Sequence, residues 1–209
     1  MMHDKLLYDW LTVAVIGFWV IITPGPNMAI VLKNSLIHAR SSGVYTAVGL
    51  ALGNLIHIFY CFVGIGVLIS KSLFLFTLLK WIGAGYLIFL GIKSLHLKSC
   101  FDISQPDITL KLSRISALRV GFLTDLLNPK ATLFFLAFFS QIVGQSTPMS
   151  VQLFYALTIV LLEFVVLFFV AVAVGHHAIR QRLQTVHHHI GRVTAAILIG
   201  LAVKVMATK

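Results

Sequence analysis

The sequence predicts an all-α integral membrane protein with six transmembrane helices, arranged as two inverted three-helix repeats. Of its 209 residues, 59% are hydrophobic and only 11% are charged, and the mean hydropathy is +0.98. A water-soluble domain of this length would need far more polar surface. The apolar residues form long segments, a pattern that differs from the short alternating strands of a membrane barrel. Two of these segments also contain proline motifs that should break a helix.

Six segments are apolar over a length that can cross a bilayer, which takes roughly 20 helical residues. They lie at about 8–32, 44–70, 72–93, 117–143, 149–174 and 190–207. The alternative for the first segment is a cleaved signal peptide. We expect a permanent helix, because acidic residues flank Lys5 and no small-residue cleavage site follows the apolar run.

The first segment is interrupted by the motif Thr23-Pro24-Gly25-Pro26-Asn27. Proline lacks a backbone donor and clashes with the preceding turn, so the helix should stop here and a short second helix should start at Pro26. Backbone groups freed at membrane depth are tolerated only where protein or water meets them. The motif therefore predicts a buried or water-filled site inside the membrane.

The fourth segment carries a matching break at Asn128-Pro129-Lys130. Asn128 suits the N-cap of the following helix, and Pro129 suits its first position. Paired breaks in two halves are typical of a transporter's binding site. Because helix starts favour anions, we expect a substrate carboxylate to lie between Asn27 and Asn128. The alternative is that these prolines only kink helices for packing.

The second segment places Gly49, Gly53 and His57 four residues apart on one helix face. Small residues at this spacing let a neighbouring helix approach closely. His57 would then lie in the crevice between the two helices, where it either relays a proton or forms a packing hydrogen bond.

A single membrane domain, 1–209, is expected to consist of two related halves. The polar segment 94–116 is a predicted cytoplasmic linker between the repeats 1–93 and 117–209. Each half holds three segments, so the second half enters the membrane from the opposite side, as in an inverted repeat. The third and sixth segments support this by their matching residues, which are Gly83, Gly91 and Lys93 in one and Gly191, Gly200 and Lys204 in the other.

Three charged residues fall inside apolar segments, namely Asp125, Lys130 and Glu163. A charge at the centre of a membrane helix costs roughly 2.5–3.5 kcal/mol on insertion scales, so these groups must pair, line water or be neutral. Lys130 can meet Asp125 across the break, or Glu163 from the fifth segment. One interpretation is substrate binding with proton coupling through Asp125, Glu163 and His57. The other is a fixed ion pair that holds two segments together.

The net charge of +10 at pH 7 does not indicate a nucleic-acid partner, because the basic residues lie mostly between the apolar segments. Ten basic residues follow the first, third and fifth segments, namely Lys33, Arg40, Lys93, Lys98, Lys111, Arg114, Arg119, Arg180, Arg182 and Arg192. Five lie on the other side of the membrane, namely Lys5, Lys71, Lys80, Lys204 and Lys209. By the positive-inside rule the richer side is cytoplasmic, so both termini should face outward.

The cysteines and histidines do not predict a metal site, and no cofactor is expected. Cys61 and Cys100 should lie at different membrane levels, so no disulfide is predicted. Histidines gather around the last cytoplasmic loop, at His176, His177, His187, His188 and His189. Their spacing matches no zinc pattern, and an exposed loop is the simpler interpretation.

The sequence around both breaks resembles that of the LysE-type translocators, in the branch of the homoserine and threonine efflux (RhtB) proteins. The similar stretches cover nearly the whole chain and are Thr23–Asn27, Gly49–His57, Lys80–Gly91, Gly121–Leu136 and Ile190–Arg192 with Gly200. The resemblance implies export of amino acids or close derivatives across the inner membrane of a bacterium, driven by proton antiport. Its implied partners are an amino-acid-like small molecule, the proton and the lipid bilayer.

Carried over by position, the resemblance implies that the substrate is bound by the two proline motifs, namely Thr23, Pro24, Gly25, Pro26, Asn27, Asn128, Pro129 and Lys130. The chain departs from the family pattern at Asp125, where asparagine is expected, and at Ser140, where proline is expected. Glu163 has no counterpart in the pattern. These departures leave the substrate and the coupling open.

Other functions are kept as alternatives. An intramembrane enzyme needs a nucleophile with a base at one depth, and no serine or cysteine motif accompanies His57 and Glu163. Clustered acidic residues or cysteines within the segments would favour export of a divalent metal, as in distant relatives of the family. An uncoupled channel and a non-transport membrane assembly factor stay open. Small residues pack either within one chain or at a homodimer seam, and they include Gly64, Gly66, Gly83, Ala84 and Gly85.

Overall fold

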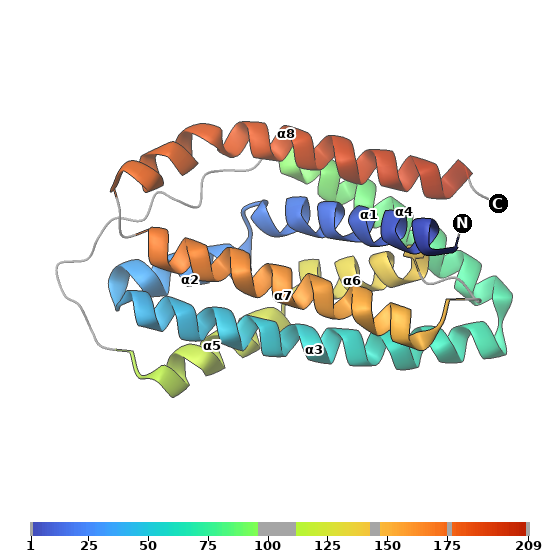
Figure 1. Cartoon of the computed structure of the whole chain (residues 1–209), viewed down its shortest axis with the longest axis horizontal. Coiled ribbons are helices and arrows are strands. Elements are labelled where there is room, and N and C mark those ends of the chain that lie inside the picture. Colours follow the sequence, from blue (N-terminus) through green and yellow to red (C-terminus); the bar gives the residue numbers. More distant parts are fainter. Residues whose placement is uncertain (1, 96–111, 143–146, 175–176, 208–209) are drawn as a thin grey trace.

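The structure is a computed structural model that describes residues 2–95, 112–142, 147–174 and 177–207. Within these ranges all regular secondary structure is helical, which confirms the predicted all-α class. The helices are α1 (Met2–Ile22), α2 (Pro26–Ile37), α3 (Arg40–Lys71), α4 (Leu73–Leu95), α5 (Arg114–Leu126), α6 (Pro129–Ile142), α7 (Met149–Ala173) and α8 (His177–Ala207). The start of α1 and the end of α8 lie at the same end of the molecule (Figure 1).

Both predicted helix breaks are present. The axes of α1 and α2 differ by 55°, and those of α5 and α6 differ by 56°. In each case the second helix begins at the predicted proline, Pro26 or Pro129. Proline is favoured there because the first helical residue has no intrahelical partner for its N–H. Gly25 precedes α2 in an extended conformation, and Asn128 precedes α6.

Two helices are each long and apolar enough to cross a membrane, at Arg40–Gly64 in α3 and Met149–Ala173 in α7. Counting each bent pair as one span raises the number to four within the described residues. Within the described parts of α4 and α8, the apolar helical segments are shorter and lie at Trp81–Leu95 and His189–Val203. The six-span inverted repeat therefore stays a prediction.

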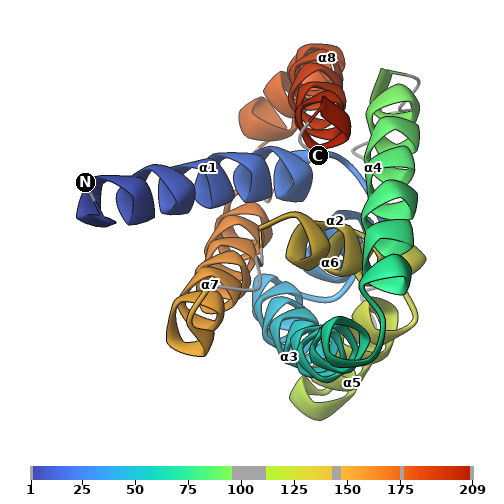
Figure 2. The ribbon, with the colours of Figure 1, turned by 90° about the vertical axis from the view of Figure 1, so that its right-hand side faces the viewer.

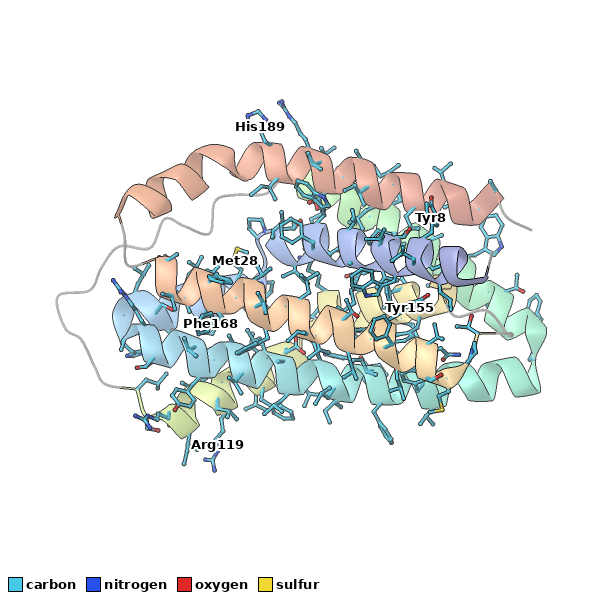
Figure 3. All side chains as sticks on the ribbon, in the orientation of Figure 1. Tyr8, Met28, Arg119, Tyr155, Phe168 and His189 are labelled. Carbon is cyan, nitrogen blue, oxygen red and sulfur yellow. The ribbon has the colours of Figure 1, made fainter. Side chains whose placement is uncertain are left out.

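The last helix is longer than predicted. It begins at His177, so the backbone at His177 and at 187–189 is helical, and the predicted histidine loop is wrong for these residues. The reason is local, because 178–184 is rich in residues of high helix propensity and contains no glycine or proline. His189 is exposed and points away from the other helices (Figure 3). His176, Cys100 and most of the predicted linker lie outside the described residues.

The half-helices α2 and α6 lie in the middle of the bundle when it is seen end-on (Figure 2). The sequence explains why α6 is central, because it carries four phenylalanines that are at most 4% exposed, namely Phe134, Phe135, Phe138 and Phe139. They pack against buried residues of α1, α4 and α7, such as Val13, Leu87 and Ile159. At the second break Asn128 is 5% exposed, although Leu127 and Pro129 on either side of it are exposed.

Glycines allow α3 and α5 to touch along their backbones. A Cβ added at Gly49 would collide with the backbone of Leu118 and Phe122, and one at Gly121 would collide with the backbone of Thr46. A Cβ at Gly53 would press on the Asp125 carboxylate. This agrees with the predicted close approach at Gly49 and Gly53, and it places Asp125 beside α3.

Candidate functional site

The two breaks meet inside the bundle through their asparagines. The Asn128 side chain donates from Nδ2 to Oδ1 of Asn27 over 2.8 Å. Oδ1 of Asn128 accepts from the backbone N–H of Lys130 at 3.0 Å, which is the predicted N-cap of α6. The structure thus brings together the two motifs that lie about 100 residues apart in the chain.

Asn27 connects this pair to two carboxylates. Its Nδ2 donates to Oδ1 of Asp125 at 2.7 Å and to Oε1 of Glu163 at 2.9 Å. Its Oδ1 accepts from Asn128, so both donors and the acceptor of this amide are engaged. A flipped amide would turn its oxygen toward two carboxylates, so the network fixes the orientation of Asn27.

The two carboxylates are buried and contact polar side chains of α3. Asp125 is 0% exposed and Glu163 is 8% exposed. The Asn54 amide donates to Oε2 of Glu163. Nε2 of His57 lies 3.0 Å from the carbonyl oxygen of Asp125 and 3.4 Å from its Oδ2, and Nδ1 contacts the Tyr60 hydroxyl. His57 therefore lies in the crevice predicted for it.

This cluster is short of hydrogen-bond partners at two atoms. Among the described residues, Oδ1 of Asn54 and Oδ2 of Asp125 are buried and accept no hydrogen bond. Asn27 also joins two carboxylates to one amide group, and His57 lies beside one of them. The cluster is therefore suited to take up a positive charge, from a proton or from a bound cationic group.

Lys130 closes the first break. Its Nζ lies 3.3 Å from the carbonyl oxygens of Val20 and Thr23, which the break leaves without helical partners. Gly25 permits this approach, because a Cβ there would lie 3.3 Å from the same Nζ. The sequence left open whether Lys130 pairs with Asp125 or with Glu163, and these contacts give its ammonium a role at the carbonyls of the break.

Two residues of this site were missed by the sequence analysis. Thr194 of α8 is 0% exposed, and its hydroxyl lies 2.8 Å from that of Thr23 and 3.2 Å from the carbonyl oxygen of Trp19. Asn54 of α3 is the second. The signal that could have found Asn54 is its position one turn before His57, inside an apolar segment.

Two cavities lie on either side of the joined breaks. The smaller has a volume of about 50 Å³ and is lined by Asn27, Asn54 and Glu163 together with Phe134 and Phe135. The larger has a volume of about 390 Å³ and lies between the breaks and α4. The residues that line both cavities are Thr23, Gly25, Pro26, Asn128 and Lys130. The breaks therefore form a partition between two compartments.

The described residues contain no group of three or more histidines, cysteines or acidic residues arranged to hold a metal ion. The cluster is built from two carboxylates, one imidazole and three amides. Such a set can bind a proton, an ammonium group or both in turn.

Known proteins resemble the chain over most of its length. The model of the LysE type translocator family matches residues 18–209. The uncharacterized membrane protein YrhP of Bacillus subtilis is 30% identical, over 97% of this chain and 98% of its own length. The leucine efflux protein of Klebsiella pneumoniae is 32% identical over 75% of this chain and 74% of its own. No solved structure matches the chain.

Proposed function

Because the chain belongs to the LysE type translocator family, we propose that it exports amino acids or close derivatives from the bacterial cytoplasm, in exchange for protons. The family consists of translocators, so the chain is a multi-pass membrane transporter and not an enzyme. The relative named as a leucine efflux protein supports a small amino acid as the cargo. The observation that carries the coupling proposal is the Asp125–Asn27–Glu163 cluster, which is joined directly to both breaks.

The substrate is proposed to bind between Lys130 and the carboxylates. The smaller cavity touches both Lys130 and Glu163, which suit the carboxylate and the ammonium of a zwitterion. The start of α6 adds backbone N–H groups and a favourable dipole for the carboxylate. Pro24, Pro26 and Pro129 shape this site by holding the breaks open, since a continuous helix would leave no free backbone groups.

Antiport follows if the proton and the substrate ammonium compete for the same carboxylates. A proton on Asp125 or Glu163 removes the charge that would attract the ammonium, so the two ligands exclude each other. His57 lies beside Asp125 and can pass the proton to or from it. Release of one ligand then allows binding of the other, provided that the site opens alternately to each side.

We propose the alternating movement to be rocking of two inverted three-helix repeats, α1–α4 and α5–α8, within the inner membrane. Three features support this arrangement: equivalent breaks bent by 55° and 56°, their contact at the centre, and chain ends at one end of the molecule (Figure 1). The excess of basic residues in the loops after the first, third and fifth segments supports an outward position for both termini.

The test is efflux from proteoliposomes preloaded with isotopically labelled amino acids, with and without a pH gradient. We expect selective efflux of one or a few amino acids, accelerated by the pH gradient. The Lys130→Ala variant should not show this efflux. Selective loss that ignores the gradient would remove proton coupling while keeping export. Full transport by folded Lys130→Ala would refute the role given to Lys130, and no selective loss from folded wild-type protein would refute export.

A further inference from the structure

The larger cavity is the only one of the two beside the breaks that can hold an amino acid in this conformation. The smaller cavity, at about 50 Å³, is far below the range of about 300–1,000 Å³ that is usual for small-molecule sites. The larger cavity, at about 390 Å³, falls within the range of about 300–1,000 Å³ that is usual for small-molecule sites. In this state the central site is therefore closed, and the space for a substrate lies beside α4.

The walls of the larger cavity are chemically complementary to a neutral amino acid. Apolar side chains from α4 and α6, including Phe89, Leu90 and Leu133, provide most of the surface. Two cations lie on it, Lys93 from the end of α4 and Lys130 from the partition. None of the described lining residues is acidic. A carboxylate therefore finds a partner there, an aliphatic side chain finds apolar walls, and a second ammonium group is repelled.

Lys93 lines the larger cavity from the last turn of α4, and it is distant from both breaks in the sequence. It is exposed, its Nζ lies 5.7 Å from the centre of the Phe89 ring, and it precedes the linker predicted to be cytoplasmic. Lys130 lines the same cavity from the partition, where its ammonium contacts the carbonyls of Val20 and Thr23. A carboxylate can thus be held first by Lys93 and then by Lys130, and the second step would loosen the partition.

We propose that the cavity between α4 and the two breaks is a loading site for neutral amino acids with aliphatic side chains, in which Lys93 binds the carboxylate and Leu133 contacts the side chain. The inference rests on the proposed export function and adds a second binding position to it. It also restricts the cargo, because lysine-like substrates should be rejected by Lys93 and Lys130 at this position. The central carboxylates are then reached only after the partition opens.

The test is direct binding of tritiated leucine to the purified full-length protein in detergent, measured by scintillation proximity. Wild-type protein should bind leucine, and unlabelled isoleucine should compete whereas lysine should not. Lys93→Gln should weaken binding about fivefold, which is the effect of one exposed charge pair, and Lys93→Arg should restore it. Lys33→Gln is the matched control, because Lys33 is exposed and lines neither cavity.

A second variant tests the cavity itself without altering its charge. Leu133→Trp fills the space and should abolish leucine binding, whereas Leu133→Met keeps the volume and should bind normally. If Lys93→Gln and Leu133→Trp both fold and bind leucine like their controls, the loading site is refuted. It is also refuted if wild-type protein binds no leucine, or if a co-purified phospholipid occupies the site and leucine does not displace it.

Transport measured in parallel separates this inference from the proposed function. Leucine binding that depends on Lys93, in a protein that shows no efflux from proteoliposomes, would support the loading site and refute export. Efflux that is equal in Lys93→Gln and Lys33→Gln, with equal binding, would support export and refute the loading site.

Discussion

Neutralising Glu163 should separate proton coupling from transport without disturbing the fold. In Glu163→Gln, the side-chain oxygen can still accept from Asn27, but the new amide group meets the Asn54 donor. Oδ1 of Asn54 has no partner among the described residues, so rotating the Asn54 amide supplies an acceptor for the new N–H. The variant is therefore predicted to keep two hydrogen bonds and to resemble a permanently protonated Glu163.

The expected change in stability is small because two effects oppose each other. Hydrogen bonds to charged groups contribute about 1.5–3 kcal/mol and neutral ones about 0.5–1.5 kcal/mol, so two weakened bonds cost roughly 2–3 kcal/mol. Removing a charge from the middle of a membrane helix recovers roughly 2.5–3.5 kcal/mol. The net effect is about 1 kcal/mol or less, which corresponds to a shift in Tm of at most about 4 °C.

Two transport assays in proteoliposomes measure the coupling between substrate and proton movement. Exchange of labelled for unlabelled amino acid at equal pH requires no net proton movement, and Asp125 still offers a carboxylate to the substrate ammonium, so Glu163→Gln should retain exchange with weaker substrate affinity. Net efflux driven by a pH gradient requires proton release, so the same variant should lose its stimulation by the gradient. Asp9→Asn is the control, because it neutralises an acidic residue outside the cluster. Full stimulation of Glu163→Gln by the gradient would refute the coupling role, and failure to fold would refute the hydrogen-bond argument.

Three further variants test the geometry around the breaks. Gly121→Leu should destabilise the protein by about 1–3 kcal/mol or more, because its side chain meets the backbone of α3, whereas Gly200→Leu has open space; equal thermal unfolding of the two would contradict the close packing of α3 and α5. Asn128→Ala should unfold about 2–4 °C below Asn128→Ser, since both lose the bond to Asn27 but serine keeps a neutral N-cap acceptor for α6, worth about 1 kcal/mol; identical Tm values would show that the cap is unimportant. Thr194→Val should lower stability by about 0.5–1.5 kcal/mol and slow efflux by loosening Thr23, with Thr12→Val, outside the site, as the control; unchanged efflux would exclude a role for α8 in holding the break.

The helix breaks were predictable from sequence because proline acts locally. Pro26 and Pro129 begin new helices wherever the rest of the chain lies, so their positions follow from the covalent chemistry of the residue. The close approach of α5 to α3 was predictable in part, since Gly49 and Gly53 indicate a crevice but do not name the helix that fills it.

The partners of the buried charges were not predictable, because they depend on rotation and depth of separate helices. The sequence did not reveal that the Lys130 ammonium contacts carbonyls of the first break, or that the Asn27 amide holds both carboxylates. The contact of Thr194 with the first break could not be predicted for the same reason, because a threonine in an apolar segment can pack against many different neighbours. The extension of α8 to His177 was missed because the prediction followed hydropathy, while the helix continues through polar residues of high propensity.

The two carboxylates and Lys130 belong to one half of the chain, and the polar groups that contact them belong to the other. Asp125, Lys130 and Glu163 come from α5, α6 and α7, whereas Asn27, Asn54, His57 and the carbonyls of Val20 and Thr23 come from α1 to α3. If the halves rock apart, Asp125, Lys130 and Glu163 lose these partners at membrane depth, where an unpaired charge costs several kcal/mol. The substrate carboxylate can replace the carbonyls at Lys130, and a proton or the substrate ammonium can replace the amides at the carboxylates. Movement of an unloaded site would leave these charges exposed and unpaired, so the division of charge between the halves is itself a reason for transport to be coupled.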